Sequence, residues 1–406
     1  YYVERVRRKL YKRTRGGGAH IASAEAILAG IASDGGLFVP ASEVKLVQQD
    51  LENLVSKSYH ERATYILQHF LTDFSEVELK DCVEKAYHTT KFNDAAIAPL
   101  SIINDELAVL ELWHGPTYAF KDMALQLLPW LLIKSAKKTG DKANYVILVA
   151  TSGDTGKAAL EGFKDVSKTK ILVFYPNQGV SEVQRLQMIT QEGSNVGVVA
   201  VEGNFDDTQN GVKDIFNDQK FKAYVGEKGY KLSSANSINW GRLVPQIVYY
   251  ISAYLDLVKF KKITLGTEIN FVVPTGNFGN ILAGFYAKKM GLPINKLVCA
   301  SNQNNVLTDF VREGIYDRNR PFYRTISPSM DILISSNLER LLFELSGGRA
   351  KAVATWMKEL QVTGRYTIDQ EVKKQVAKHF WSQFSTDVET KEKIKNVFET
   401  YQYLID

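Results

Sequence analysis

The chain has 406 residues, of which 45% are hydrophobic, and a formal net charge of +5 at pH 7. This length suggests two or three domains, and the apolar content is sufficient for sizeable cores, which excludes a largely disordered chain. No run of about 18 uncharged apolar residues occurs, so a membrane span is disfavoured and we expect a soluble, cytoplasmic protein.

Much of the positive charge lies in the first fifteen residues. The basic residues there are Arg5, Arg7, Arg8, Lys9, Lys12, Arg13 and Arg15. Targeting segments and nucleic-acid arms can begin in this way, but Glu4 interrupts the run, and no basic stripe interleaved with aromatic residues follows. We therefore expect a solvated surface segment and no nucleic-acid partner.

The cysteines and histidines give no sign of a metal site. Cys82 and Cys299 lie in apolar surroundings more than two hundred residues apart, which favours neither a metal-ligand spacing nor a disulfide framework. The six histidines contain no HExxH or paired-ligand pattern. We expect no metal, and this composition suits a reducing cytoplasm.

The first 95 residues are rich in helical patterns. Apolar side chains recur at helical spacing over 23–33, and "SDGGLFVP" at 33–40 predicts a turn followed by a short strand. Further along, "SEVELKDCVEKAYH" opens with Ser75 as an N-cap and Glu78 as its capping-box partner. We assign residues 1–95 to a helix-rich N-terminal domain.

From residue 96 the pattern changes to short apolar runs separated by helical segments. The runs that predict strands lie at 145–150, 170–175, 196–201, 269–274 and 296–301. Strands that are buried on both faces and alternate with helices form parallel βαβ units. We therefore expect an α/β fold with one or two open, doubly wound parallel sheets over residues 96–406.

Two of the predicted strand-to-helix loops combine glycine with small polar residues: "ATSGDTGKAAL" at 150–160 and "PTGNFGNILAGF" at 274–285. Ligands of open α/β sheets bind beyond the carboxyl ends of the strands, and the first N–H groups of the next helix are unpaired and partly positive. Both loops are candidate anion sites, although the same residues are also ordinary turn formers and helix caps.

Neither loop matches a nucleotide-binding fingerprint. The dinucleotide pattern GxGxxG is absent from the segments that start at Gly153 and Gly276. The P-loop pattern GxxxxGK[ST] fails because Thr151 replaces its first glycine and Ala158 its last position. Dinucleotides and nucleoside triphosphates are therefore disfavoured as ligands.

"LWHGPTYAFKDMALQLL" at 112–128 places Lys121 where a Gly-Pro loop becomes a helix. The helix dipole and the nearby Phe120 and Trp113 favour a neutral amine, which is the form needed for a Schiff base, whereas Asp122 opposes this unless it turns away to cap the helix. A lone lysine of this kind is more simply an exposed one. Combined with two anion loops, it indicates a cofactor with an aldehyde and a phosphate, namely pyridoxal phosphate.

Four ordered segments resemble the threonine synthases of bacteria and fungi. They are "HGPTYAFKDMAL" (114–125), "ATSGDTGKAAL" (150–160), "SANSINWGRLVPQIVYY" (234–250) and "PTGNFGNILAGFYAKKMGLP" (274–293). The resemblance runs from about residue 11 to 406 and implies the tryptophan-synthase-β-like fold (fold type II) of pyridoxal-phosphate enzymes. It also implies the conversion of O-phospho-L-homoserine and water to L-threonine and phosphate.

The resemblance assigns roles to individual residues. Lys121 matches the lysine that forms the Schiff base. The loop that holds the cofactor phosphate matches Gly276, Asn277, Phe278, Gly279 and Asn280. The loop that closes on the substrate matches Ser152, Gly153, Asp154 and Thr155. His114 and Thr117 belong to the lysine motif and are expected to line the pocket.

For the substrate phosphate we consider three further residues. Arg242 can bind a phosphate through two parallel N–H bonds, Asn239 is a second candidate, and Lys157 is a weaker one. Each can equally be structural. In this scheme Lys121 is the base for the Cα and Cβ protons, water adds at Cβ after phosphate leaves, and a lid closes over the substrate.

Two alternatives remain open. A phospho-lyase of the same fold would convert the substrate to a 2-oxo acid, and a catalytically silent homologue would keep the fold alone. Family members also continue beyond a stretch like "YQYLID" to a strand whose hydroxyl meets the pyridine nitrogen, so we expect the C-terminal end at Asp406 to be incomplete. We expect a small-molecule substrate and a monomer or homodimer.

Overall fold

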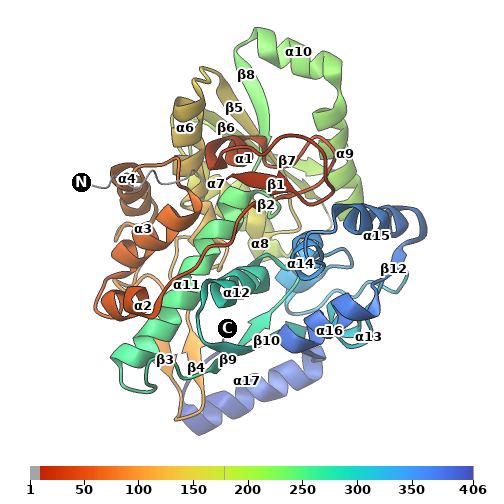
Figure 1. Cartoon of the computed structure of the whole chain (residues 1–406). Coiled ribbons are helices and arrows are strands. Elements are labelled where there is room, and N and C mark those ends of the chain that lie inside the picture. Colours follow the sequence, from red (N-terminus) through yellow and green to blue (C-terminus); the bar gives the residue numbers. More distant parts are fainter. Residues whose placement is uncertain (1–9, 178, 406) are drawn as a thin grey trace.

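The computed structural model describes residues 10–177 and 179–405 (Figure 1). The basic residues within 1–9 lie outside the described residues, so the expected surface segment stays a prediction for them.

The N-terminal region is mainly helical. A short antiparallel pair, β1 (Tyr11–Arg13) and β2 (Phe38–Pro40), precedes the last three of its helices. The helices are α1 (Ser23–Ala29), α2 (Gln48–Leu54), α3 (Tyr59–Phe70) and α4 (Glu76–Ala86). Ser75 and Glu78 form the predicted capping box. Because α1 and α4 pack on a helix of the catalytic region and share its hydrophobic core, a domain boundary near residue 95 stays a prediction.

The first large sheet has four parallel strands in the order β7-β6-β5-β8. Its strands are β5 (Asn144–Ala150), β6 (Thr169–Pro176), β7 (Val196–Val201) and β8 (Tyr230–Ser234). The helices around it are α6 (Leu128–Thr139), α7 (Asp154–Phe163), α8 (Glu182–Ile189), α9 (Phe205–Asn217) and α10 (Gln219–Glu227). Three of these strands were predicted; β8 lies at the sheet edge and lacks a continuous apolar run.

The second sheet has three parallel strands in the order β13-β10-β9. Its strands are β9 (Ile269–Pro274), β10 (Ile294–Ser301) and β13 (Phe380–Phe384). The helices that follow β9 and β10 are α12 (Gly279–Met290), α13 (Val306–Glu313), α14 (Leu338–Leu345), α15 (Ala350–Thr363), α16 (Gln370–His379) and α17 (Asp387–Tyr401). The α/β class with two parallel sheets is therefore confirmed.

Smaller elements complete the chain. Two antiparallel pairs join β3 (Leu100–Ile102) to β4 (Ala108–Leu110) and β11 (Ile315–Asp317) to β12 (Arg365–Thr367). A short helix, α5 (Asp122–Leu125), follows β4, and a single 3₁₀ turn, η1 (Pro328–Met330), precedes α14. No helix within the described part of the chain is long and apolar enough to cross a membrane.

Helix α11 (Trp240–Lys259) runs diagonally through the middle of the view in Figure 1. Its residues from Trp240 to Leu255 are all buried, and it packs against α3, α5 and α12. A helix that is apolar on every side is stable only when it is surrounded by other elements. This central helix therefore connects the N-terminal helices, the lysine loop and the second sheet.

Candidate functional site

A cavity of about 1850 Å³ lies at the carboxyl ends of strands from both sheets. The loop after β5 contributes Ser152 and Thr155 to its lining, and the loop after β9 contributes residues 274–280. Lys121 and Arg242 also line it. The two loops that the sequence singled out, which are more than a hundred residues apart, therefore meet at one cavity.

Lys121 is the N-cap residue of α5, and its backbone carbonyl accepts a hydrogen bond from Leu125 N at 2.9 Å. Its side chain is only 12% exposed, and its Nζ lies 3.5 Å from Asp154 Oδ2. Burial lowers the pKa of Lys121 most strongly; the charge of Asp154 opposes this, and that of Arg242 adds to it. The balance favours the neutral amine more than in an exposed lysine.

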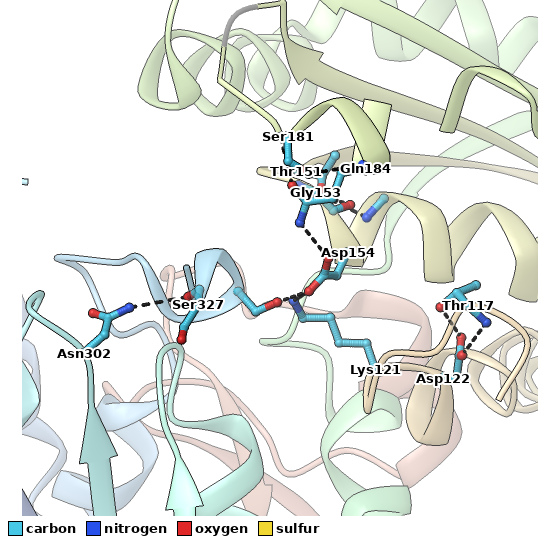
Figure 2. Close-up of polar contacts among 12 residues, drawn as sticks. Thr117, Lys121, Asp122, Thr151, Gly153, Asp154, Ser181, Gln184, Asn302 and Ser327 are labelled. Atoms are coloured by element: carbon cyan, nitrogen blue, oxygen red, sulfur yellow. Dashed lines mark hydrogen bonds and ion pairs between the residues drawn. The ribbon is translucent and has the colours of Figure 1, made fainter. Parts of the chain in front are cut away.

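Asp122 points away from this amine, as Figure 2 shows. Its carboxylate accepts hydrogen bonds from Thr117 N at 2.8 Å, Thr117 Oγ1 at 2.9 Å and Gln126 Nε2 at 3.3 Å. Burial raises the pKa of Asp122 to about 6. Asp122 thus holds the loop before Lys121 rather than pairing with the lysine.

The loop after β5 is held in a narrow turn. Thr151 Oγ1 accepts hydrogen bonds from Gly153 N at 3.0 Å and Gly156 N at 2.9 Å. Gly153 has φ of 147°, and a Cβ at this position would lie 2.3 Å from the Gln184 amide. Only glycine can therefore occupy this position without displacing Gln184.

Asp154 joins three parts of the site (Figure 2). Besides its contact with Lys121, it accepts a hydrogen bond from Gln184 Nε2 of α8 at 2.7 Å and another from Ser329 Oγ of η1. Ser329 lies on the segment between β11 and α14. A single carboxylate therefore connects the lysine with both halves of the cavity.

The carbonyl groups of Gly276 and Asn277, in the loop after β9, accept hydrogen bonds from the segment before α14. Ser335 Oγ donates to Gly276 O at 2.7 Å, and Asn337 donates to Asn277 O from both its N and its Nδ2, each at 3.1 Å. Phe278, with φ of 62°, is the N-cap residue of α12, whose first N–H groups have no partner within the helix. This helix start can bind an anion.

Two further features of this loop support its shape. A Cβ on Gly276 would lie 3.2 Å from Met330 Cα, so a side chain there would displace the neighbouring segment. Asn280 Oδ1 accepts hydrogen bonds from Tyr249 OH at 2.6 Å and Tyr250 OH at 2.7 Å. The start of α12 is thus fixed against α11.

Arg242 is buried and only partly bonded. Its Nη1 donates to Ala235 O at 2.9 Å, whereas its buried Nε has no partner among the described residues. Burial lowers the pKa of Arg242 to about 10. A buried donor without a partner, on a side chain that lines the cavity, is a natural contact for an anionic ligand.

The side chain of Asn239 is engaged in structural contacts. Its Oδ1 caps α11 by accepting from Gly241 N at 2.8 Å, and its Nδ2 donates to Ile27 O at 3.0 Å and Ser234 O at 3.4 Å. Asn239 lines the cavity, but these contacts favour its structural interpretation over a role in binding phosphate.

Five other candidates are not among the residues that line the cavity: Gly153 and Asp154, whose neighbours Ser152 and Thr155 do line it, and Thr117, His114 and Lys157. Thr117 is bound by Asp122, and His114 bonds through its two ring nitrogens to Asn93 at 2.7 Å and Glu111 at 2.8 Å. Lys157 Nζ bonds to Gln191 Oε1 at 2.5 Å. The expectation that His114 and Thr117 line the pocket therefore differs from the structure. Their polar side-chain atoms instead form hydrogen bonds that hold the loop before Lys121.

The sequence did not indicate Gln184 or Ser329. Gln184 contacts the site only because Ser181 caps α8 and so begins this helix beside the loop after β5. Ser329 belongs to the segment 318–336, which contains one short 3₁₀ turn and many cavity-lining residues. Because the sequence of this segment has no helical or strand periodicity, it does not predict which part of the protein the segment will cover.

The chain matches two family models: residues 10–87 match the one described as "Threonine synthase N terminus", and residues 99–365 match "Pyridoxal-phosphate dependent enzyme". It is 41% identical over 397 residues to the threonine synthase of Pseudomonas aeruginosa, covering 98% of this chain and 81% of that protein. The chain belongs to the threonine synthase family. This confirms the fold type and identifies pyridoxal phosphate as the cofactor of its enzyme class.

Solved structures of threonine synthases have the same fold as this chain. The pyridoxal-phosphate-bound threonine synthase from Brucella melitensis superposes with a TM-score of 0.90 at 41% identity, covering 98% of this chain and 83% of that chain. Threonine synthase-like 1 of Homo sapiens is 43% identical over 392 residues, which make up 94% of this chain and 52% of that protein. The chain thus spans about half the length of the threonine synthase-like 1 proteins that it matches.

Proposed function

We propose that the chain is a threonine synthase, which converts O-phospho-L-homoserine and water to L-threonine and phosphate with pyridoxal phosphate bound at Lys121. One observation carries the proposal: one cavity is lined by Lys121, by the loop 276–280 at the start of α12 and by Arg242, whose Nε has no partner within the described part of the chain. An aldehyde and two phosphates, one on the cofactor and one on the substrate, would each have a chemically suitable partner there.

The residues present are suited to the cofactor. The backbone N–H groups at the start of α12 would hold its phosphate, with the partial positive charge of the helix end adding to the attraction. Gly276 keeps this loop close to Met330, where a Cβ would not be accommodated without movement. Lys121 Nζ would bind the aldehyde carbon, since its burial favours the nucleophilic form.

When bound, pyridoxal phosphate supplies a ring that withdraws electrons from the substrate carbons. Lys121 Nζ, which lies within the cavity, would be the base that removes the Cα and Cβ protons of the substrate. Asp154 Oδ2, 3.5 Å away, stabilises Lys121 in the protonated form after each transfer. Lys121 can then return a proton without a second acid from the protein.

Arg242 would bind the substrate phosphate and stabilise it as it leaves. Its burial makes each N–H bond to an anion stronger than in water, and its planar guanidinium fits two phosphate oxygens. The contact of Asp154 with Ser329 closes the loop after β5 against the segment 318–336. Together these segments would admit one water molecule to Cβ and exclude others.

The test is a product analysis. The purified chain, loaded with pyridoxal phosphate, is incubated with O-phospho-L-homoserine, and threonine, phosphate and 2-oxobutyrate are measured. We expect threonine and phosphate in equal amounts. A protein that binds no cofactor would support a silent homologue instead.

A phospho-lyase is the second candidate, because the same lysine and anion sites in the cavity would serve either reaction. The two activities differ in whether water is added at Cβ or the product is released and hydrolysed to a 2-oxo acid. Dominant 2-oxobutyrate in the same assay would make the threonine synthase proposal wrong and favour the lyase.

A further inference from the structure

The start of α14 contacts four segments that are distant from it in the sequence. Glu339 accepts hydrogen bonds from Thr14 Oγ1 at 2.5 Å and from Arg15 at 2.8 and 2.9 Å. Asn337, the N-cap residue of α14, contacts the loop after β9, and Arg340 contacts both β2 and the segment before α11. This turn therefore joins the N-terminal region to the proposed cofactor-phosphate loop.

Arg340 is fully buried, with 0% of its surface exposed. Its Nε donates to Phe38 O at 2.9 Å, its Nη1 to Asn337 Oδ1 at 2.5 Å and its Nη2 to Ile238 O at 2.6 Å. The guanidinium also lies 5.8 Å from the ring centroid of Trp240. Its contacts thus fix both the position and the orientation of the group.

The charge of Arg340 has no direct counter-charge in the described part of the chain. No carboxylate there forms an ion pair with it; the adjacent Glu339, which is bonded to Arg15, acts on Arg340 only through its charge, and burial outweighs this effect and lowers the pKa of Arg340 to about 10. A buried cation without an anionic partner is costly to the fold. Such a group becomes favourable when an anion binds nearby, which here would be the cofactor phosphate.

Asn337 links Arg340 to the loop. Its Oδ1 accepts from Arg340 Nη1, and its Nδ2 and N both donate to Asn277 O at 3.1 Å. This carbonyl belongs to the same peptide group as the N–H of Phe278, at the start of α12. Hydrogen bonds in series polarise one another, so the positive charge of Arg340 makes that N–H a stronger donor to an anion.

We propose that Arg340 is a positioning residue for the cofactor phosphate: it orients Asn337, which fixes the peptide between Asn277 and Phe278, and its buried charge strengthens anion binding at the start of α12. The inference rests on the proposed assignment of residues 276–280 to that phosphate. It adds a residue more than sixty positions from the loop that does not touch the cofactor itself.

The experiment compares pyridoxal phosphate with pyridoxal, which has the same aldehyde but no phosphate. Dissociation constants for both are measured by absorbance with the unmodified chain and with Arg340→Met. Loss of charge-assisted hydrogen bonding should weaken pyridoxal phosphate by about tenfold or more and leave pyridoxal almost unchanged. The rise in melting temperature that inorganic phosphate gives the cofactor-free chain should also become smaller.

Arg62→Met is the matched control. Arg62 is also buried, at 2% exposure, and donates to Leu54 O at 3.0 Å, Val55 O at 2.8 Å and Asp256 Oδ1 at 2.7 Å. None of these partners lines the cavity. This variant should lower the melting temperature but keep the preference for pyridoxal phosphate over pyridoxal.

The other possible results distinguish a wrong role for Arg340 from a wrong assignment of the phosphate loop. An unchanged preference in Arg340→Met, or an equal loss for both ligands, overturns the role of Arg340. If the unmodified chain itself shows no preference for pyridoxal phosphate, the assignment of the loop is wrong instead. Should Arg340→Met fail to fold, Asn337→Ser keeps the arginine, removes the Nδ2 donor to Asn277 and carries the same comparison.

Discussion

Lys121 Nζ lies 3.5 Å from Asp154 Oδ2, although the two residues come from different loops, one before α5 and one after β5. Burial lowers the pKa of the lysine, and the carboxylate acts in the opposite direction. The pKa of Lys121 is therefore set by two opposing effects, burial and the charge of Asp154, and a substitution can change one without the other.

Asp154→Asn removes the negative charge that raises the pKa of Lys121, so this pKa should fall further. A larger fraction of free amine is then present at low pH, and the acidic limb of the rate of cofactor attachment should shift to lower pH. Stopped-flow absorbance across pH measures this. Asp309→Asn, which breaks an ion pair with Arg320 away from the cavity lining, should leave the profile in place.

Lys121→Ala should abolish covalent attachment of pyridoxal phosphate and turnover while the fold is kept. The reason is that, of the three lysines that line the cavity in the described part of the chain, Lys121, Lys213 and Lys222, only Lys121 has an ion pair with Asp154 of the loop after β5. Borohydride reduction followed by mass spectrometry checks attachment, and circular dichroism checks the fold. Lys134→Ala, whose amine pairs with Asp81, is the control and should still be trapped; trapping of Lys121→Ala at the same level would refute the assignment.

Arg242 and Asn239 are adjacent in the fold, but substituting them should affect different quantities: substrate binding for Arg242 and stability for Asn239. Arg242→Gln loses a charge and should lower kcat/KM for O-phospho-L-homoserine by about tenfold to a hundredfold, mainly through KM. Asn239→Ala loses a helix cap and should lower the free energy of unfolding by about 1 kcal/mol with a smaller effect on KM. Steady-state kinetics and denaturant unfolding separate the two, and the reverse pattern would exchange their roles.

Asp122 gives a prediction for stability against pH. Its pKa in the folded chain is raised to about 6, so the folded state binds its proton more tightly than the unfolded state does. Its contribution, on the order of 3 kcal/mol, is therefore present below about pH 4 and lost as the pH rises through 6. The free energy of unfolding measured between pH 4.5 and 7 should decline less steeply in Asp122→Asn; identical slopes would contradict this.

The strands that the sequence predicted share one property. Each of the predicted runs, such as Tyr145–Ala150, is apolar at nearly every position, and each lies in one of the two large sheets. The unpredicted β13 alternates, with Phe380 and Ser382 buried and Trp381 exposed, so its pattern is that of a strand covered on one face only. Its pairing with β10 spans more than seventy residues, which no local pattern encodes.

The site was predictable where a local motif carries the chemistry. Lys121, the turn at Gly153 and the helix start at Phe278 lie within their own motifs, and the cavity brings these motifs together. Ser329 and Arg340 could not be predicted, because their contacts depend on how distant segments pack. His114 was assigned to the pocket from its motif alone, yet the direction of its ring is set by Asn93 and Glu111.

Helix α11 contributes to both anion sites of the proposed enzyme. Arg242 lies in its first turn, and Tyr249, about 10 Å further along its axis, holds the Asn280 end of the other site. Because the buried part of this helix, from Trp240 to Leu255, does not stretch, we expect the spacing between these two sites to stay constant. With one site taken by the cofactor phosphate, the substrate would have to reach from the cofactor aldehyde to Arg242, and a phosphorylated amino acid one carbon shorter, O-phosphoserine, would place its phosphate short of that arginine.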